Sequence, residues 1–371
     1  MSAGPQAGHP RSAAAQLARE SREWSPPYPV DVRLVLSVHC RGSRDPAYRT
    51  DASGAVWRTV LTPDGPGTLR VAARSAALLT RPSALVAGPS APPAPAAGPA
   101  PAARPAPAAR PARAAGPAPA ARPAADGGTQ VTAAAWGPGA AWLLEMLPSL
   151  LGETDDQAGF APVHPLLREM AGRHPGARVG RSGRVLEALV PAILEQKVVG
   201  AEARRAWQYL LRRFGQPAPG PAPAGMRVFP DARAWAQIPS WEWHRAGVEP
   251  RRAAAIAGAA RAAARLEEIL TMAADDADRR LRSLPGVGPW TSAEVRQRAC
   301  GDADAVSVGD YNLPAAVGWA LAGRIVDDAG MLDLLAPYAG HRYRATRLVE
   351  LSGVRPPRRG PRLAVREYRT F

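Results

Sequence analysis

Cysteine, lysine and long apolar runs are scarce in this chain of 371 residues, and each scarcity excludes a kind of chemistry. Cys40 and Cys300, the two cysteines, lie far apart and show no CxxC spacing. This excludes an all-cysteine iron–sulfur cluster and argues against a zinc site, so we expect a reduced cytoplasmic protein. No segment approaches the ~20 apolar residues of a membrane span, and residues 1–26 hold no signal-like apolar stretch. We therefore expect a soluble protein with no membrane partner.

Lysine occurs once, as Lys197, among 47 basic residues. A lysine amine is the side chain that readily forms a Schiff base, so a covalent mechanism of that kind has one candidate. The formal net charge is +15, but much of it lies in two arginine-rich segments, residues 88–127 and 354–371. The rest of the chain is mildly basic, which suits a protein that contacts a limited number of phosphates.

Proline and glycine divide the chain into regions. Between residues 88 and 127, near-repeats of Pro-Ala-Ala-Arg contain too little bulky apolar surface to stabilise a fold. We predict a disordered insert there, inside an N-terminal domain of residues 28–164. The chain ends are predicted to be a disordered leader, residues 1–27, and a flexible basic tail, residues 354–371.

Apolar spacing predicts an α+β protein: a small, antiparallel, β-rich N-terminal domain followed by an all-α domain of residues 165–353. The N-terminal strands are predicted at 30–36, 56–61, 68–71 and 129–132, with a helix at 140–151. Turn sequences at 51–54 and 64–67 separate three of these strands. Later helices are predicted at 186–198, 203–214, 250–269, 278–284 (capped by Asp278), 291–300, 313–321 and 342–351.

The segment Leu284-Pro285-Gly286-Val287-Gly288, followed by Pro289-Trp290-Thr291, is the most specific functional pattern. Pro285 fixes one φ angle, Val287 can anchor the turn in the core, and the two glycines leave the backbone amides bare. A phosphate can approach such amides closely, and the helix that follows presents its positive end. We predict a phosphate-binding hairpin, with a plain structural turn between helices as the alternative.

Asp310 and Tyr311 follow about twenty residues after this hairpin. Asp310 stands just before Asn312-Leu313-Pro314, a sequence typical of a helix start, where aspartate is a common N-cap. Taken alone, this position favours the capping role for Asp310.

The hairpin and Asp310 together resemble the helix-hairpin-helix DNA glycosylases, and within them the DNA-3-methyladenine glycosylase II family. The resemblance covers residues 28–86 and 129–353 and is strongest at 284–321. It implies a base-excision-repair enzyme that extrudes a base from double-stranded DNA. Asp310 would stabilise the oxocarbenium-like sugar and orient the attacking water. The resemblance implies no organic cofactor, allows a K⁺ or Na⁺ ion at the hairpin carbonyls, and leads us to expect a monomer.

The neighbouring residues indicate a subclass within that resemblance. Trp290 occupies the position of the lysine in lyase-competent members, so we interpret the chain as a monofunctional enzyme that uses water. Trp290 and Tyr311 resemble the aromatic base pocket of the alkylation-repair branch, which favours a cationic alkylated purine.

Gln196 and Lys197 match the segment from which that branch sends a wedge and a minor-groove contact into the duplex. Lys197 departs from the apolar residue often found there, so it can insert, contact a phosphate or remain a solvated charge. Two alternative functions stay open. One is a bifunctional glycosylase and lyase acting through Lys197, and the other is a non-catalytic DNA-binding module in which Asp310 is only a cap.

Overall fold

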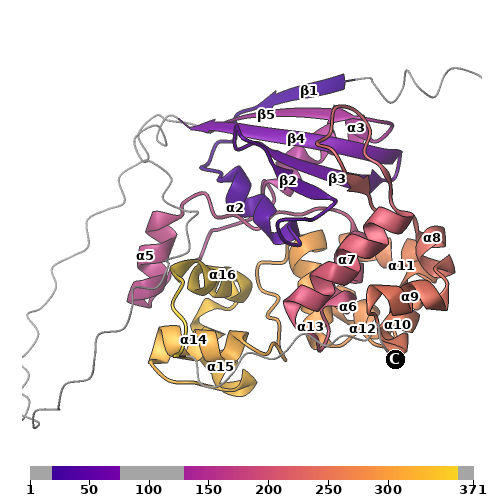
Figure 1. Cartoon of the computed structure of the whole chain (residues 1–371). Coiled ribbons are helices and arrows are strands. Elements are labelled where there is room, and N and C mark those ends of the chain that lie inside the picture. The colour runs from indigo at the N-terminus through magenta and orange to yellow at the C-terminus, as the bar shows by residue number, and fades with distance from the viewer. Residues whose placement is uncertain (1–18, 76–128, 358–371) are drawn as a thin grey trace, which may run out of the picture. The chain divides into compact units, whose positions relative to one another are not determined.

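The computed structural model describes residues 19–75 and 129–357. Residues 1–18, 76–128 and 358–371 are not described, so the predicted insert at 88–127 and most of the predicted tail and leader lie outside the description. The described residues up to Arg74 and from Thr129 onward belong to one unit, which combines a β-sheet with a set of helices (Figure 1). This confirms the predicted α+β class, while the proposed domain boundary at residue 164 stays a prediction.

The N-terminal part is a five-stranded sheet with the order β1-β5-β4-β3-β2. Antiparallel pairing joins β1 to β5, β2 to β3 and β3 to β4. The strands are β1 (Arg19–Trp24), β2 (Tyr48–Thr50), β3 (Val56–Thr62), β4 (Gly65–Ser75) and β5 (Thr129–Trp136). The helices α3 (Ala140–Glu145) and α4 (Leu147–Leu150) follow at the predicted place.

Two predictions for the N-terminal part are wrong. Residues 19–24 belong to the predicted disordered leader, yet they form β1 and pair along their length with β5. The predicted strand at 30–36 is instead the helix α2 (Val32–Leu36), because Asp31 Oδ1 accepts a hydrogen bond from the Leu34 amide at 2.9 Å and caps it. A 3₁₀ turn, η1 (Ser37–His39), continues α2.

The helical part contains two buried cores. One surrounds α6 (Val185–Leu194), which is almost entirely buried, and includes the inner faces of α7 (Gly200–Phe214) and α10 (Pro250–Arg261). The other core joins α5 (Pro165–Arg173) to a group that Figure 1 shows together. That group is α14 (Leu313–Ala322), α15 (Asp328–Leu335) and α16 (Arg342–Ser352).

Shorter elements complete the helical part. They are β6 (Gln216–Pro217), β7 (Arg227–Val228), α8 (Ala232–Gln237), α9 (Ser240–Ala246), α11 (Ala263–Glu267), η2 (Glu268–Thr271), α12 (Ala274–Arg282), α13 (Pro289–Val295), the π-helical turn η3 (Arg296–Cys300) and η4 (Ala336–Tyr338). The predicted capping role of Asp278 is wrong, because α12 begins four residues earlier and Asp278 accepts a hydrogen bond from Ser292 Oγ at 2.7 Å. Within the described residues, 19–75 and 129–357, no helix is long and apolar enough to cross a membrane.

Candidate active site

The predicted hairpin, which begins at Leu284 and runs to Thr291, lies between α12 and the first turn of α13. Gly286 has φ +86°, and a Cβ at this position would lie 3.0 Å from the Cβ of Ala255 on α10, so the fold itself requires glycine there. Val287 is buried in the core around α6, as predicted. Gly288 differs, because its φ of −100° suits any residue and a Cβ there would meet nothing within 4 Å. Packing inside the protein therefore does not require glycine at position 288. The absence of a side chain there leaves the backbone accessible to a partner outside the protein.

Gln196 connects the hairpin to the turn between α6 and α7. Its Nε2 donates to the carbonyl of Gly286 and to Thr291 Oγ1, each at 2.8 Å. The side chain of Thr291 is buried, so its hydroxyl serves this contact and does not face solvent. The amide nitrogen of Gln196 is thus used within the protein, and a minor-groove contact stays a prediction for its oxygen.

Lys197 lies next to Gln196 in the same turn, residues 195–199, and not on a helix as predicted. Its side chain is exposed and its φ is +54°, a value shared by no other non-glycine residue in the described segments. A left-handed conformation costs a non-glycine residue about 1 kcal/mol or more, so it persists where neighbouring contacts enforce it. The turn is therefore held by its surroundings.

Asp310 uses its two carboxylate oxygens differently. Oδ1 accepts the amide hydrogens of Asn312 at 2.8 Å and Leu313 at 2.9 Å, which caps the start of α14. Oδ2 accepts the indole Nε1–H of Trp290 at 3.0 Å. The helix that follows the hairpin and the predicted catalytic carboxylate are therefore in direct contact. Asp310 also accepts amides at the start of α14, although the N-cap position itself is held by Asn312 and not, as its sequence position favours, by Asp310.

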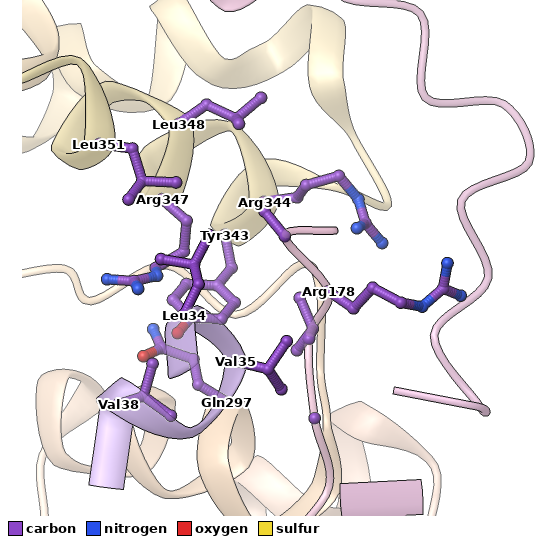
Figure 2. Close-up of a pocket in the computed structure, with 13 residues that line it drawn as sticks. Leu34, Val35, Val38, Arg178, Gln297, Tyr343, Arg344, Arg347, Leu348 and Leu351 are labelled. Atoms are coloured by element: carbon purple, nitrogen blue, oxygen red, sulfur yellow. The ribbon is translucent and has the colours of Figure 1, made fainter. Parts of the chain in front are cut away.

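Tyr311 lies beside Asp310 but is 85% exposed, whereas Trp290 is half-buried. The two aromatic side chains thus do not enclose a shared pocket in this structure. The cavity in Figure 2 lies between α2 and α16 and has a volume of about 30 Å³, which is room for a water molecule or two. Leu34, Tyr343 and Arg347 are among its lining residues, and neither Trp290 nor Asp310 is.

A largely buried polar network supports the loop that carries Asp310, and the sequence does not predict it. Glu294 pairs with Arg298 Nη1 at 2.7 Å and accepts the hydroxyl of Ser307 at 2.7 Å. The carbonyl of Ser307 in turn accepts the amide hydrogen of Asp310 at 3.2 Å. Glu294 and Arg298 are one helical turn apart, which is a detectable signal, but the contact with Ser307 depends on the fold.

Comparisons with known proteins show similarity to one curated DNA repair protein and to solved structures of DNA glycosylases. No family model matches the chain. The "Probable bifunctional transcriptional activator/DNA repair enzyme AlkA" of Mycobacterium tuberculosis is 32% identical over 151 residues, which are 40% of this chain and 30% of that protein. The chain thus covers less than a third of the length of these curated relatives.

Solved structures match over far more of the chain. The 3-methyladenine DNA glycosylase from Archaeoglobus fulgidus aligns with a TM-score of 0.61 at 15% identity, over 90% of this chain and 98% of the other. The chain has the DNA glycosylase fold. An 8-oxoguanine glycosylase/lyase from Clostridium acetobutylicum aligns with a TM-score of 0.57 at 10% identity, over 87% and 93% of the two chains. These alignments confirm the resemblance to the helix-hairpin-helix glycosylases at the level of fold, which both kinds of enzyme share.

Proposed function

We propose that this protein is a monofunctional DNA N-glycosylase, of the EC 3.2.2.21 type, that removes alkylated purines from double-stranded DNA. The contact between Trp290 Nε1 and Asp310 Oδ2 carries this proposal, because it joins an aromatic side chain, a carboxylate and the hairpin helix in one place. The similarity to a protein named as a DNA repair enzyme supports the same class of activity.

The hairpin would hold the DNA backbone. The first amides of a helix have no acceptor within the helix, and α13 begins directly after Gly288. Without a Cβ on Gly288, a phosphate can approach these amides closely. A K⁺ or Na⁺ ion at the hairpin carbonyls remains part of the proposal. The Gly286 carbonyl already accepts one hydrogen bond from Gln196 and keeps a second lone pair for a cation.

Asp310 would stabilise the sugar as the base departs. Two backbone amides fix Oδ1 and the indole fixes Oδ2, so the carboxylate is oriented before DNA arrives. Preorganised charge of this kind stabilises a developing oxocarbenium ion without reorganisation during the reaction. Oδ2 keeps a further lone pair with which it can orient water.

The aromatic residues favour an alkylated purine. Methylation at a ring nitrogen makes the base cationic, which attracts it to the face of Trp290 and makes it a good leaving group. Such a base needs no proton from the enzyme, and the site has one central carboxylate. Tyr311, which is exposed in the free protein, could cover the extruded base from the other side.

A lyase activity through Lys197 is the second candidate. One observation favours it: Gln196 ties the Lys197 turn to the hairpin, which brings the single lysine to the region of the site. We favour the hydrolytic function because Trp290, not a lysine, follows the hairpin glycines and contacts Asp310.

Base release separates these proposals. Duplex DNA treated with a methylating agent is incubated with the protein, and the freed bases are resolved by chromatography. We expect 3-methyladenine and 7-methylguanine to be released and the DNA backbone to stay intact. Borohydride added during the reaction traps a Schiff base, so a covalent protein–DNA adduct would replace the monofunctional proposal with the lyase. A purified protein that releases no base would leave DNA binding as the function.

A further inference from the structure

A loop from the N-terminal part of the chain reaches the helical part beside the candidate site. This segment, residues 40–47, lies between η1 and β2 and is called the docking loop below. Its Arg41 places Nη1 at 3.2 Å from Oε1 of Glu195, the residue that directly follows α6. Glu195 immediately precedes Gln196 and Lys197, so the ion pair lies at the first residue of the turn 195–199.

The docking loop is anchored independently of the Arg41 side chain. The buried carboxylate of Asp45 accepts the backbone amides of Arg41 at 2.6 Å and Ala47 at 2.9 Å. It also accepts the indole N–H of Trp207 on α7 at 2.8 Å. Three donors satisfy this buried charge, which makes the loop a firm support on α7. Removal of the Arg41 guanidinium should therefore leave the loop in place.

The ion pair itself is well shielded from water. The side chain of Arg41 is 11% exposed and that of Glu195 is 28% exposed, so solvent screens the pair less than a surface pair. After Glu195, the side-chain amide of Gln196 is hydrogen-bonded to the hairpin, and Lys197 has a positive φ. The turn is thus held at its start by the docking loop and in its middle by the hairpin.

We propose that Arg41 is a positioning residue, which fixes the turn 195–199 so that it can fill the gap left by an extruded base. This inference rests on the proposed glycosylase function. Extrusion costs a few kcal/mol, and an element that fills the gap offsets that cost only if it is already ordered. Arg41 touches neither the DNA nor the base in this scheme, and it acts through Glu195.

The test compares Arg41→Ala with two controls in single-turnover base release. Arg41→Lys keeps the charge, and Arg70→Ala removes a different ion pair, which joins Arg70 on β4 to Asp51 directly after β2 at 3.3 Å. Each protein acts on a methylated purine opposite its normal partner and opposite an abasic site, where extrusion costs less. We expect Arg41→Ala to be slower by about tenfold on the paired lesion but by less than about threefold opposite the abasic site. Arg41→Lys should recover most of the rate, and Arg70→Ala should match the wild type on both duplexes.

Hydrogen exchange of the free protein gives a readout that does not need activity. The backbone amides of residues 195–199 should exchange faster in Arg41→Ala and in Glu195→Gln than in the wild type or in Arg70→Ala. Unchanged exchange, or an equal loss of rate on both duplexes, would overturn the positioning role. If the wild type releases no base, the glycosylase proposal fails, while the exchange experiment still decides whether Arg41 orders the turn.

Discussion

Replacement of Asp310 by asparagine separates the hydrogen bonds that Asp310 makes in the structure from the catalytic role that we propose for it. Asparagine can still accept the amides of Asn312 and Leu313 through Oδ1, because its side-chain oxygen accepts amides at a helix start about as well as that of aspartate. Its Nδ2 then faces Trp290 Nε1, so two donors meet where the carboxylate had accepted a hydrogen bond. Because Trp290 is half-buried, water can satisfy the displaced indole, and the loss of folding stability should stay below about 1 kcal/mol.

The loss of catalysis should be much larger. A carboxylate about 4 Å from a unit positive charge contributes about 4 kcal/mol at an effective dielectric constant near 20. Since each ~1.4 kcal/mol changes a rate tenfold, Asp310→Asn should lower the single-turnover rate of base release by about 10²–10³-fold. Asp310→Ala removes the cap as well, and it should cost a further ~1 kcal/mol of unfolding free energy.

The assay measures single-turnover release of a methylated purine together with urea unfolding of the same preparations. Asp231→Asn is the matched control, because Asp231 caps α8 by accepting the amide of Ala234 at 2.7 Å and lies outside the candidate site. We expect Asp231→Asn to keep the wild-type rate. A loss of less than about threefold for Asp310→Asn, or a loss no larger than that of Asp231→Asn, would show that Asp310 is only a cap.

Three further predictions follow from the same geometry. Gly288→Ala should change the free energy of unfolding by less than about 0.5 kcal/mol but weaken binding to duplex DNA about tenfold, as measured by fluorescence anisotropy. Gly286→Ala, at φ +86°, should lower the free energy of unfolding by about 1–2 kcal/mol. If Gly288→Ala binds DNA as tightly as the wild type, no phosphate lies close to the hairpin at this position. Trp290→Phe keeps the aromatic face but removes the hydrogen-bond donor to Asp310, so its base-release rate should fall by about tenfold or less. Trp290→Ala also removes the aromatic face, so its rate should fall further. Equal rates for the two variants would contradict the role of the ring face. Burial, together with Arg58, Arg298 and Arg41, lowers the pKa of His39 well below its usual value, so unfolded His39 takes up a proton below pH ~6.5 while the folded residue stays neutral. The free energy of unfolding should therefore be unaffected by His39 above that pH and fall below it, by up to about 1.4 kcal/mol per pH unit, and urea titrations of His39→Gln should show a smaller fall.

The sequence predicts the helical part better than the edge of the sheet, and the reason is the range of the interactions. Helical spacing, capping residues and the Gly-x-Gly pattern act over a few neighbouring residues, so a short window contains the signal. Strand β1 is the polar segment Arg-Glu-Ser-Arg-Glu-Trp, without apolar alternation, and it is ordered by pairing with β5 more than a hundred residues away. Nothing local distinguishes such a segment from a flexible leader.

The error at α2 has a different origin. Val32, Val35 and Leu36 are buried at the spacing of one helix face, but the apolar residues at even positions from 30 to 36 also resemble a strand. A run of this length fits both periods, and the deciding contact is the cap by Asp31. The sequence also indicates that Gln196 and Trp290 belong to a site, but it does not identify their hydrogen-bond partners. Gln196 contacts Gly286 and Thr291, and Trp290 contacts Asp310, and these partners are distant in the sequence and come together only in the folded chain.

The sequence offers capping and catalysis as alternative roles for Asp310, but the hydrogen bonds in the structure make the first compatible with the catalytic role that we propose. Capping occupies Oδ1 with two amides that belong to the start of α14, and this leaves Oδ2 directed at Trp290. Rotation of the carboxylate away from Trp290 would break both capping bonds, so the stability of α14 itself opposes it. The orientation that the proposed reaction needs is therefore established when the protein folds, and DNA binding need not supply it.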